Sequence, residues 1–258
     1  MTDASSFDSQ ALAGRVAVVT GAAGGLGLAI TQRLHAMGAQ VVQVDVAFAA
    51  EPAANAQGLA LGCDLADPQA IADLGQRVKE GWGRCDILVN NAAVSAPAVP
   101  LEDFPADQWD RIFGINLKAA LLCAQALVPM MFEREAGCII NVASIAARSA
   151  TRVAAYGPAK AGLLGLTQQM AIEWGPRGIR TNSISPGLIR TPLSEDFYRD
   201  PAQLQARVSK VPVRRIGRPM DIGDAVGFLA SDAAQYINGQ DLTVDGGFMK
   251  ASLFNLYG

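Results

Sequence analysis

Tyr156 and Lys160 are four residues apart at the start of a long helical pattern, so their side chains share one face of that helix. A lysine ammonium near a phenol favours the phenolate and lowers the tyrosine pKa from about 10 toward neutral pH. Such a phenol acts as a general base toward an alcohol or as a general acid toward a ketone. Ser144 follows an apolar run twelve residues before Tyr156, where its hydroxyl can orient the reacting oxygen. These residues predict proton transfer at an alcohol or carbonyl oxygen.

Two asparagine positions are open to a catalytic and to a structural interpretation. Asn116 begins a helical pattern, where it suits either a helix N-cap or a catalytic role. Asn90, Asn91, Ala92 and Ala93 close an apolar run, where small residues permit backbone approach to a nicotinamide ribose. An ordinary asparagine-rich turn is the alternative at that position. A Tyr-x-x-x-Lys spacing is common by chance, so on its own it is weak evidence for catalysis. It becomes specific only together with the motifs that accompany it.

A glycine-rich turn joins the first apolar run to the first helical pattern, in the sequence T-G-A-A-G-G-L-G from Thr20 to Gly27. Glycines at positions 21, 25 and 27 allow a tight turn, close approach of a pyrophosphate, and close packing of helix on strand. The following helix N-terminus offers free N–H groups to the phosphates. Position between strand and helix favours dinucleotide binding over an ordinary flexible turn. No Lys-Ser/Thr pair follows, so this is not a Walker A loop.

Asp45 ends the second apolar run, about twenty residues past the glycines, where a carboxylate accepts hydrogen bonds from ribose hydroxyls and repels a 2′-phosphate. The residues expected to flank the ribose, Ala22, Ala23 and Val46, are not basic. The sequence therefore predicts NAD rather than NADP, although a solvated strand-end aspartate would look the same. Asp64, with Leu65 after it, either accepts from the adenine amino group or caps the helix that begins near residue 67.

Short apolar runs alternate with amphipathic stretches, which predicts a parallel sheet covered by helices on both faces. We expect helices near residues 26–37, 67–81, 106–113, 117–134, 154–175 and 221–231. We expect strands at residues 15–20, 40–46, 58–63, 86–90, 137–142, 179–185 and 241–244. The chain reads as one domain, 1–258, of the Rossmann-type doubly wound α/β class. Residues 187–215 are predicted to form a substrate lid, and residues 1–13 a loose N-terminal extension.

Composition excludes several classes of protein. The 21 basic and 24 acidic residues give a net charge of −3, which provides no attraction to nucleic acid or to an anionic membrane. His35 is the single histidine, so no multi-histidine zinc site exists and no metal is expected. The four cysteines form no C-x-x-C motif and are expected to be buried thiols. The polar N-terminus does not resemble a signal peptide, and the apolar stretch 119–132 is too short for a membrane span, so a cytoplasmic location is expected.

Together these motifs closely resemble the short-chain dehydrogenase/reductase family, in its compact branch of about 250 residues, over roughly positions 14–248. The resemblance makes Ser144, Tyr156 and Lys160 the catalytic triad and Asn116 the fourth member of a proton relay. It assigns Pro186, Gly187, Ile189 and Thr191 to the nicotinamide carboxamide. The full set implied to bind the cofactor is Gly21, Ala23, Gly24, Gly25, Leu26, Gly27, Asp45, Asp64, Leu65, Asn90, Asn91, Ala92, Tyr156, Lys160, Pro186, Gly187, Ile189 and Thr191.

The resemblance also implies seven strands in the order 3-2-1-4-5-6-7 and homotetramers built through the helices near 117–134 and 154–175. The sequence departs from the family pattern at Leu26, Ala93 and Pro158, each in a conservative or tolerated way. Proline is tolerated in the first turn of a helix, so we expect the helix to begin close to Tyr156. Enoyl reductases of the superfamily carry six residues between tyrosine and lysine, whereas this chain has three.

The function expected is NAD-dependent interconversion of a secondary alcohol and a ketone. Sugars, polyols, steroids and cyclic alcohols remain open as substrates. The residues expected to contact substrate are Ser144, Tyr156, Ala96, Ile145, Arg148, Gly187 and Leu188, with Arg148 either pairing with an anionic substrate or lying free in solvent. The tail at 248–258 either covers a pocket or packs on another subunit. An NADPH-dependent 3-oxoacyl-carrier-protein-type reductase and a non-catalytic NAD-binding protein are the alternative functions.

Overall fold

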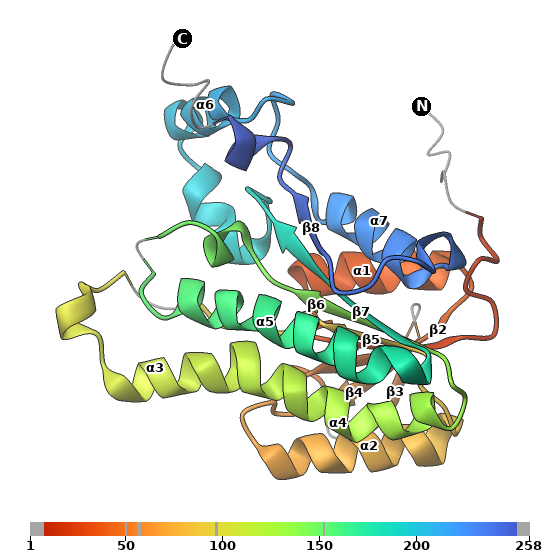
Figure 1. The fold of residues 1–258 in the computed structure, drawn as a ribbon. Coiled ribbons are helices and arrows are strands. Elements are labelled where there is room, and N and C mark those ends of the chain that lie inside the picture. Colours follow the sequence, from red (N-terminus) through yellow and green to blue (C-terminus); the bar gives the residue numbers. More distant parts are fainter. Residues whose placement is uncertain (1–7, 50, 56–57, 96–97, 152, 252–258) are drawn as a thin grey trace.

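A sheet of seven parallel strands, extended at one edge by a short antiparallel strand, forms the centre of the computed structural model (Figure 1). The structure describes residues 8–49, 51–55, 58–95, 98–151 and 153–251. The strand order is β3-β4-β2-β1-β5-β6-β7-β8. The strands are β1 (Val16–Thr20), β2 (Gln40–Asp45), β3 (Ala53–Asn55), β4 (Gly58–Gly62), β5 (Ile87–Asn90), β6 (Gly137–Val142), β7 (Ile179–Pro186) and β8 (Asp241–Val244).

Helices cover both faces of the sheet, as the alternating pattern predicts. On one face lie α1 (Gly25–Ala36) and α7 (Pro219–Ala230), which pack against each other, and on the other lie α2 (Pro68–Trp82), α4 (Ala119–Phe132) and α5 (Tyr156–Trp174) (Figure 1). Each face has its own apolar core. The α1/α7 core includes Val19, Ile30 and Leu229, and the α2/α4 core includes Leu74 and Leu127.

All seven parallel strands end at the same edge of the sheet, and this edge positions the site. In register, Thr20 lies opposite Val44, Asn90 opposite Asn141, and Pro186 opposite Val244. Loops that leave the carboxyl ends of open parallel sheets form the ligand-binding crevice of this class of fold. The predicted family topology is confirmed by the order of the seven parallel strands.

The predicted strand count is wrong by one. β3 pairs antiparallel with β4 through Ala53↔Ala60 and Asn55↔Gly58. Its three residues are small or polar and fully on the surface, so they carry no apolar alternation that reveals a strand. Gln43 Nε2 reaches across to Asn55 Oδ1 at 2.7 Å and holds this edge.

The prediction of a loose extension at 1–13 is wrong for the part the structure describes, residues 8–13. Leu12 is fully buried in the α1/α7 core, and its N–H donates to the Met37 carbonyl at 2.8 Å. A single apolar residue in a turn has no periodicity, so the sequence offered no signal for this contact.

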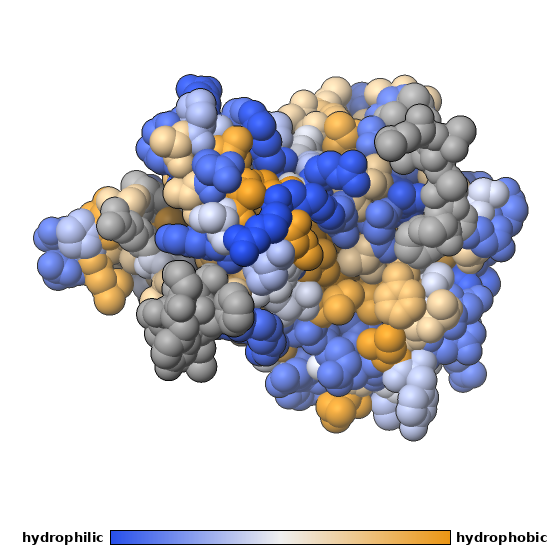
Figure 2. Space-filling model, turned by 90° about the horizontal axis from the view of Figure 1, so that it is seen from above, coloured by the Kyte–Doolittle hydropathy of each residue, from blue (hydrophilic) through white to orange (hydrophobic). Residues whose placement is uncertain are grey.

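The predicted lid at 187–215 contains more regular structure than its weak periodicity indicates. A 3₁₀ helix, Pro192–Tyr198, precedes α6 (Pro201–Lys210), and both lie above the carboxyl edge of the sheet (Figure 1). Asp200 caps α6 by accepting from the Ala202 N–H at 2.9 Å, and Pro201 occupies the first helical position. Seen from this side, hydrophilic and apolar residues are mixed over the surface (Figure 2).

Two predicted helices, 106–113 and 117–134, are one continuous helix. One π-helical turn, Gly114–Lys118, joins α3 (Ala106–Phe113) to α4. Among the described residues, this helix of 27 residues is the one whose length and hydropathy would allow a membrane crossing. In the fold it packs on α2 and the sheet, and its residues Cys123, Ala124 and Leu127 are buried there.

Candidate active site

Ser144, Tyr156 and Lys160 meet at the carboxyl end of β6. Ser144 follows β6 and caps a 3₁₀ turn, Ile145–Ala147, by accepting from the Ala146 N–H at 3.1 Å. Tyr156 is the first residue of α5, as expected from Pro158 in the first helical turn. The Ser144 side chain lies close enough to the Tyr156 hydroxyl to act on the pKa of the phenol in the lowering direction. The predicted proton-transfer pair is therefore assembled by a strand end and a helix start.

Burial sets the ionisation of Tyr156, in the direction opposite to that expected from the sequence. Desolvation raises the pKa of the Tyr156 phenol, and the hydrogen bond with Ser144 acts in the lowering direction. The Lys160 Nζ lies 5.8 Å from the ring centroid and donates to a backbone carbonyl, and burial of the phenol outweighs the lowering of the Tyr156 pKa that was expected from this lysine. The Ser144 side chain is therefore a group of the chain that favours the phenolate of Tyr156.

Lys160 is buried, with 2% of its surface exposed. Its Nζ donates to the Val142 carbonyl at the end of β6, 2.7 Å away. Desolvation lowers the pKa of Lys160 to about 8. A buried lysine with a pKa close to neutral can gain or lose a proton under ordinary conditions, which suits a proton relay.

Asn116 lies inside the π-helical turn and is 2% exposed, so the N-cap interpretation is wrong. Its side chain makes a pair of hydrogen bonds with one residue: Nδ2 donates to the Val94 carbonyl at 2.9 Å, and Oδ1 accepts from the Val94 N–H at 2.8 Å. Asn116 thus fixes the loop that leaves β5. π-Helical turns occur frequently at functional sites, because the wider turn displaces backbone groups from the regular pattern.

The glycine turn has the geometry that the spacing predicts. Gly21 has φ +65°, and a Cβ there would approach the Ala92 Cα to 2.7 Å. A Cβ at Gly27 would overlap the carbonyl oxygen of Gly21, so α1 packs directly on the turn. Asn91 Nδ2 donates to the carbonyls of Thr20 and Gly21 at 2.9 and 3.0 Å, which fixes the turn to the end of β5.

Asp45 lies beside this turn at the end of β2. Its Oδ2 accepts from the Ala23 N–H and its Oδ1 from the Ala47 N–H, both at 3.0 Å. Val46 points into solvent with 72% of its surface exposed. The predicted ribose carboxylate and glycine turn are therefore in direct contact.

Asp64 does not cap a helix, so that alternative is wrong. Its Oδ1 accepts from the Ala66 N–H at 2.9 Å, whereas Asp67 caps α2 by accepting from the Gln69 N–H at 2.9 Å. Asp64 is exposed and Leu65 half-buried at the carboxyl end of β4. An adenine contact by these residues stays a prediction.

A buried amide chain crosses the sheet below the site. Asn90 Nδ2 donates to Asn141 Oδ1 at 2.9 Å, and Asn141 Nδ2 donates to Thr167 Oγ1 at 2.8 Å, which links β5, β6 and α5. The Asn90 Oδ1 atom is buried without a partner among the described residues. Thr20 Oγ1 accepts from the N–H groups of Asn91 and Ala92. The asparagine-rich segment therefore has a structural role that the sequence did not specify.

The segment after β7 returns to the glycine turn. A Cβ built on Gly25 would lie 3.8 Å from the Thr191 Cβ, so these predicted cofactor residues are neighbours. Ile189 forms a bridge with Gly217, and the Gly187 N–H donates to the Val244 carbonyl at 3.0 Å. Pro186 is the buried last residue of β7. These contacts enclose the crevice from the lid side.

The residues present fit a dinucleotide. Gly24 caps α1 without a side-chain hydrogen bond, so the first N–H groups of the helix are not taken by a cap. The start of α1 at Gly24, Gly25 and Leu26 could therefore hold an anion next to Asp45. A nicotinamide dinucleotide laid along this edge would run from Asp45 to Tyr156.

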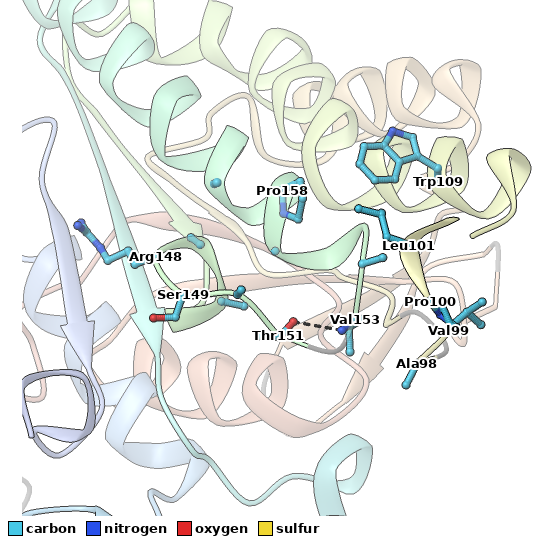
Figure 3. Close-up of a pocket in the computed structure, with 16 residues that line it drawn as sticks. Ala98, Val99, Pro100, Leu101, Trp109, Arg148, Ser149, Thr151, Val153 and Pro158 are labelled. Atoms are coloured by element: carbon cyan, nitrogen blue, oxygen red, sulfur yellow. Dashed lines mark hydrogen bonds between the residues drawn. The ribbon is translucent and has the colours of Figure 1, made fainter. Parts of the chain in front are cut away.

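A cavity of about 810 Å³ opens beside the first turn of α5 (Figure 3). Trp109 and Leu101 lie at one end and Arg148 at the other, with Val153 and Pro158 between them (Figure 3). Among the described residues that were expected to contact substrate, Arg148 is the one that lines it. Ile145 and Leu188 are half-buried nearby, and Ala96 lies outside the described residues, as does part of the tail, 252–258. Sequence reasoning missed Trp109, whose aromatic character in an amphipathic helix resembles that of a core residue.

Arg148 lies on the surface, with 49% of its side chain exposed, and its guanidinium is paired with a carboxylate. Its Nε and Nη2 donate to Asp241 Oδ2 at 3.1 and 3.0 Å. The interpretation as a surface arginine agrees with its exposure, and a contact with an anionic substrate stays a prediction.

The cysteines and the histidine take no part in this site. Cys63, Cys85, Cys123 and Cys138 are buried free thiols, as predicted, and burial raises the pKa of each. His35 is exposed in the last turn of α1. No group of three or more potential metal ligands occurs in the described part of the chain.

Comparison with known proteins agrees with this geometry. A family model described as enoyl-(acyl carrier protein) reductase matches residues 21–249. A cis-4-hydroxycyclohexanecarboxylate dehydrogenase from Sinomonas cyclohexanicum is 37% identical over 247 residues, covering 93% of this chain and 98% of the relative. A D-threitol dehydrogenase from Mycolicibacterium smegmatis is 40% identical over 245 residues, covering 92% and 94%.

A solved structure from Agrobacterium tumefaciens, provisionally named a 2-deoxy-D-gluconate 3-dehydrogenase and containing NADP, superposes with a TM-score of 0.81 at 35% identity. It covers 95% of this chain and 100% of that one. The chain belongs to the short-chain dehydrogenase/reductase family. It is an oxidoreductase of the class that acts on CH–OH groups with a nicotinamide dinucleotide.

Proposed function

We propose that this protein oxidises a secondary alcohol to a ketone with NAD, using Tyr156 as the general acid/base. The observation that carries the proposal is that Ser144, Tyr156 and buried Lys160 meet at the carboxyl end of β6, with the Ser144 side chain acting on the Tyr156 phenol and Lys160 one helical turn further along α5. Both hydroxyls lie at the sheet edge that carries the glycine turn and Asp45. A substrate oxygen placed between them would meet a donor and an acceptor at once.

The protein's part in the reaction is to hold the alcohol and to move its proton. Ser144 orients the alcohol oxygen, and Tyr156 takes the hydroxyl proton as general base. Lys160 stabilises the phenolate when charged, binds the ribose and passes the proton outward, with Asn116 supporting the relay. The bound nicotinamide would supply the hydride acceptor, which is the cofactor's own chemistry. In the reverse direction, Tyr156 returns the proton to the ketone oxygen.

The preference for NAD over NADP rests on Asp45. A carboxylate beside the Ala23 N–H repels a 2′-phosphate, and positions 22, 23, 46 and 47 carry no basic side chain to attract one. A solved relative with bound NADP makes this the finer point to test. Replacing Asp45 by serine together with Val46→Arg should shift the preference toward NADP by at least tenfold in kcat/KM. An unchanged ratio would remove Asp45 from the specificity argument.

The substrate proposed is a small secondary alcohol, with cyclic alcohols, sugars and polyols as the classes to test. The cavity beside α5 is lined mainly by apolar residues, among them Val99, Leu101, Trp109 and Val153. We also propose a cytoplasmic homotetramer built through α4 and α5, which sedimentation of the purified protein would test. A monomer in solution would contradict the tetramer without affecting the chemistry.

An absorbance assay at 340 nm tests the function directly. Purified protein is mixed with pools of cyclic alcohols, sugars, polyols, hydroxysteroids and hydroxy acids, with NAD⁺ and NADP⁺ in parallel. A rise with NAD⁺ supports the proposal, and separating the pool identifies the substrate class. A rise with NADP⁺ alone would favour the 3-oxoacyl-carrier-protein-type reductase. No turnover in either direction despite NAD binding would favour a non-catalytic NAD-binding protein.

A further inference from the structure

Arg148 and Asp241 form an ion pair that spans 93 positions of sequence and connects the Ser144 turn to the far edge strand. Asp241 is the first residue of β8, and 8% of its side chain is exposed. Arg148 ends the 3₁₀ turn that begins at Ser144, and 49% of its side chain is exposed. A carboxylate this buried requires partners, because desolvation of an unpaired charge is costly.

Asp241 is also held from the neighbouring strand. Its Oδ1 accepts from Ser183 Oγ at 2.7 Å and from Ser185 Oγ at 2.9 Å, and the latter also lies 2.9 Å from Oδ2. Both serines lie on one face of β7 and are at most 1% exposed. The carboxylate is therefore fixed by the sheet itself, and Arg148 is the partner that reaches it from outside.

The turn that Arg148 ends is short and internally bonded. The Ala147 N–H donates to the Ser144 carbonyl at 2.9 Å, and the Arg148 N–H donates to the Ile145 carbonyl at 3.0 Å. A displacement of Arg148 is therefore transmitted through only one helical turn to Ser144. The start of α5 packs on the same turn, because a Cβ at Gly157 would lie 3.0 Å from the Ala146 carbonyl oxygen.

We propose that the Arg148–Asp241 pair is a positioning pair, which holds the Ser144 turn against the sheet so that the Ser144 hydroxyl stays beside the Tyr156 hydroxyl. Arg148 touches neither reacting atoms nor, by this account, an anionic substrate. It acts through Ser144. The expected effect of the pair on turnover rests on the proposed function, whereas its expected effect on the position of Ser144 does not.

The first test needs no substrate. Protein labelled with ¹³C at the tyrosine Cζ atoms is examined by NMR, and Tyr156→Phe assigns the Tyr156 signal. Ser144→Ala defines the change in the Tyr156 signal caused by loss of the Ser144 hydroxyl. Arg148→Ala and Asp241→Asn should move the signal in the same direction, and Arg148→Lys should restore most of it.

Arg15→Ala is the matched control. Arg15 also pairs with one carboxylate, that of Asp232, but it precedes β1 and so lies at the amino ends of the strands, away from Tyr156. It should leave the Tyr156 signal in place. An unmoved signal in a folded Arg148→Ala protein would overturn the proposal, and so would an equal shift in Arg15→Ala.

The second test uses turnover once a substrate is known. Because a displacement of about 1 Å can cost about 100-fold in rate, Arg148→Ala should lower kcat by roughly 10- to 100-fold while the dissociation constant for NADH stays within about twofold. The double variant Arg148→Ala/Asp241→Asn should be no slower than the slower single variant, since both break one interaction. The proposal would be overturned if the reductions of kcat in the two single variants multiplied in the double variant, or if kcat were unchanged in Arg148→Ala. Failure of the wild type to turn over any alcohol would instead count against the proposed function and leave the NMR result standing.

Discussion

Replacing Lys160 by methionine tests how burial controls the charge in this site. Desolvation lowers the pKa of Lys160 from its ordinary 10.5 to about 8 in the folded chain. At pH 7 the lysine is charged in both states, so the lower folded-state pKa makes folding less favourable by about 3 kcal/mol. Because the folded pKa lies below the unfolded one, this penalty is complete below pH 8 and disappears as the pH rises toward 10.5.

The variant removes the charge and keeps the length of the side chain. It also loses the hydrogen bond to the Val142 carbonyl, worth about 1 kcal/mol. Lys160→Met should therefore be at least as stable as the wild type at pH 7, while turnover is lost. Between pH 7 and 9.5 the free energy of unfolding of the wild type should rise by about 2 kcal/mol relative to that of the variant. This value follows from the folded and unfolded pKa values of Lys160.

Urea unfolding at a series of pH values measures this difference. The buried cysteines and Tyr156 also titrate at high pH, but they are common to both proteins and cancel in the comparison. Lys118→Met is the control, because it makes the same replacement at an exposed lysine in the π-helical turn. Parallel curves for wild type and Lys160→Met would refute the argument that burial sets the charge of Lys160.

Three further outcomes follow from packing and burial. Gly27→Ala should lower Tm sharply because its Cβ would overlap the Gly21 carbonyl, whereas Gly24→Ala, with no atom within 4 Å of its Cβ, should leave Tm unchanged; equal effects would contradict the packing. Leu12→Ala should cost about 3 kcal/mol in urea unfolding because Leu12 is fully buried, and a cost below about 0.5 kcal/mol would restore the loose N-terminus. A thiol reagent at pH 8 should react with no cysteine of the native protein and with all four after unfolding, since burial raises even the pKa of Cys63 to about 11; rapid native reaction would show that these thiols are accessible.

The parallel strands and the glycine turn could be predicted because each has a local signal. β-Branched runs mark buried strands, and a glycine cluster between strand and helix marks the dinucleotide turn. β3 has three exposed small or polar residues, and Leu12 is one apolar residue in a turn, so neither has a period to detect. The start of α6 does have a local signal, an N-cap at Asp200 followed by Pro201 at the first helical position. The weak apolar periodicity of this segment is the reason why no helix was predicted there.

The site shows the same division between local and distant information. Tyr156 and Lys160 share a helix face that their spacing alone predicts. The Arg148–Asp241 pair joins residues 93 positions apart, and no spacing rule connects them. The ionisation of Tyr156 depends on burial, which becomes known only from the packing around it. Sequence therefore identified the reacting groups, whereas the structure determines what surrounds and orients them.

The most direct test of the central claim compares wild type with Tyr156→Phe. Turnover of an identified alcohol is followed at 340 nm with NAD⁺, and NADH binding is followed separately by its fluorescence. The account predicts that turnover falls by at least 1,000-fold, roughly the contribution of a general base, while the dissociation constant for NADH stays within about twofold. Near-normal turnover by Tyr156→Phe would contradict the assignment of Tyr156 as the general acid/base.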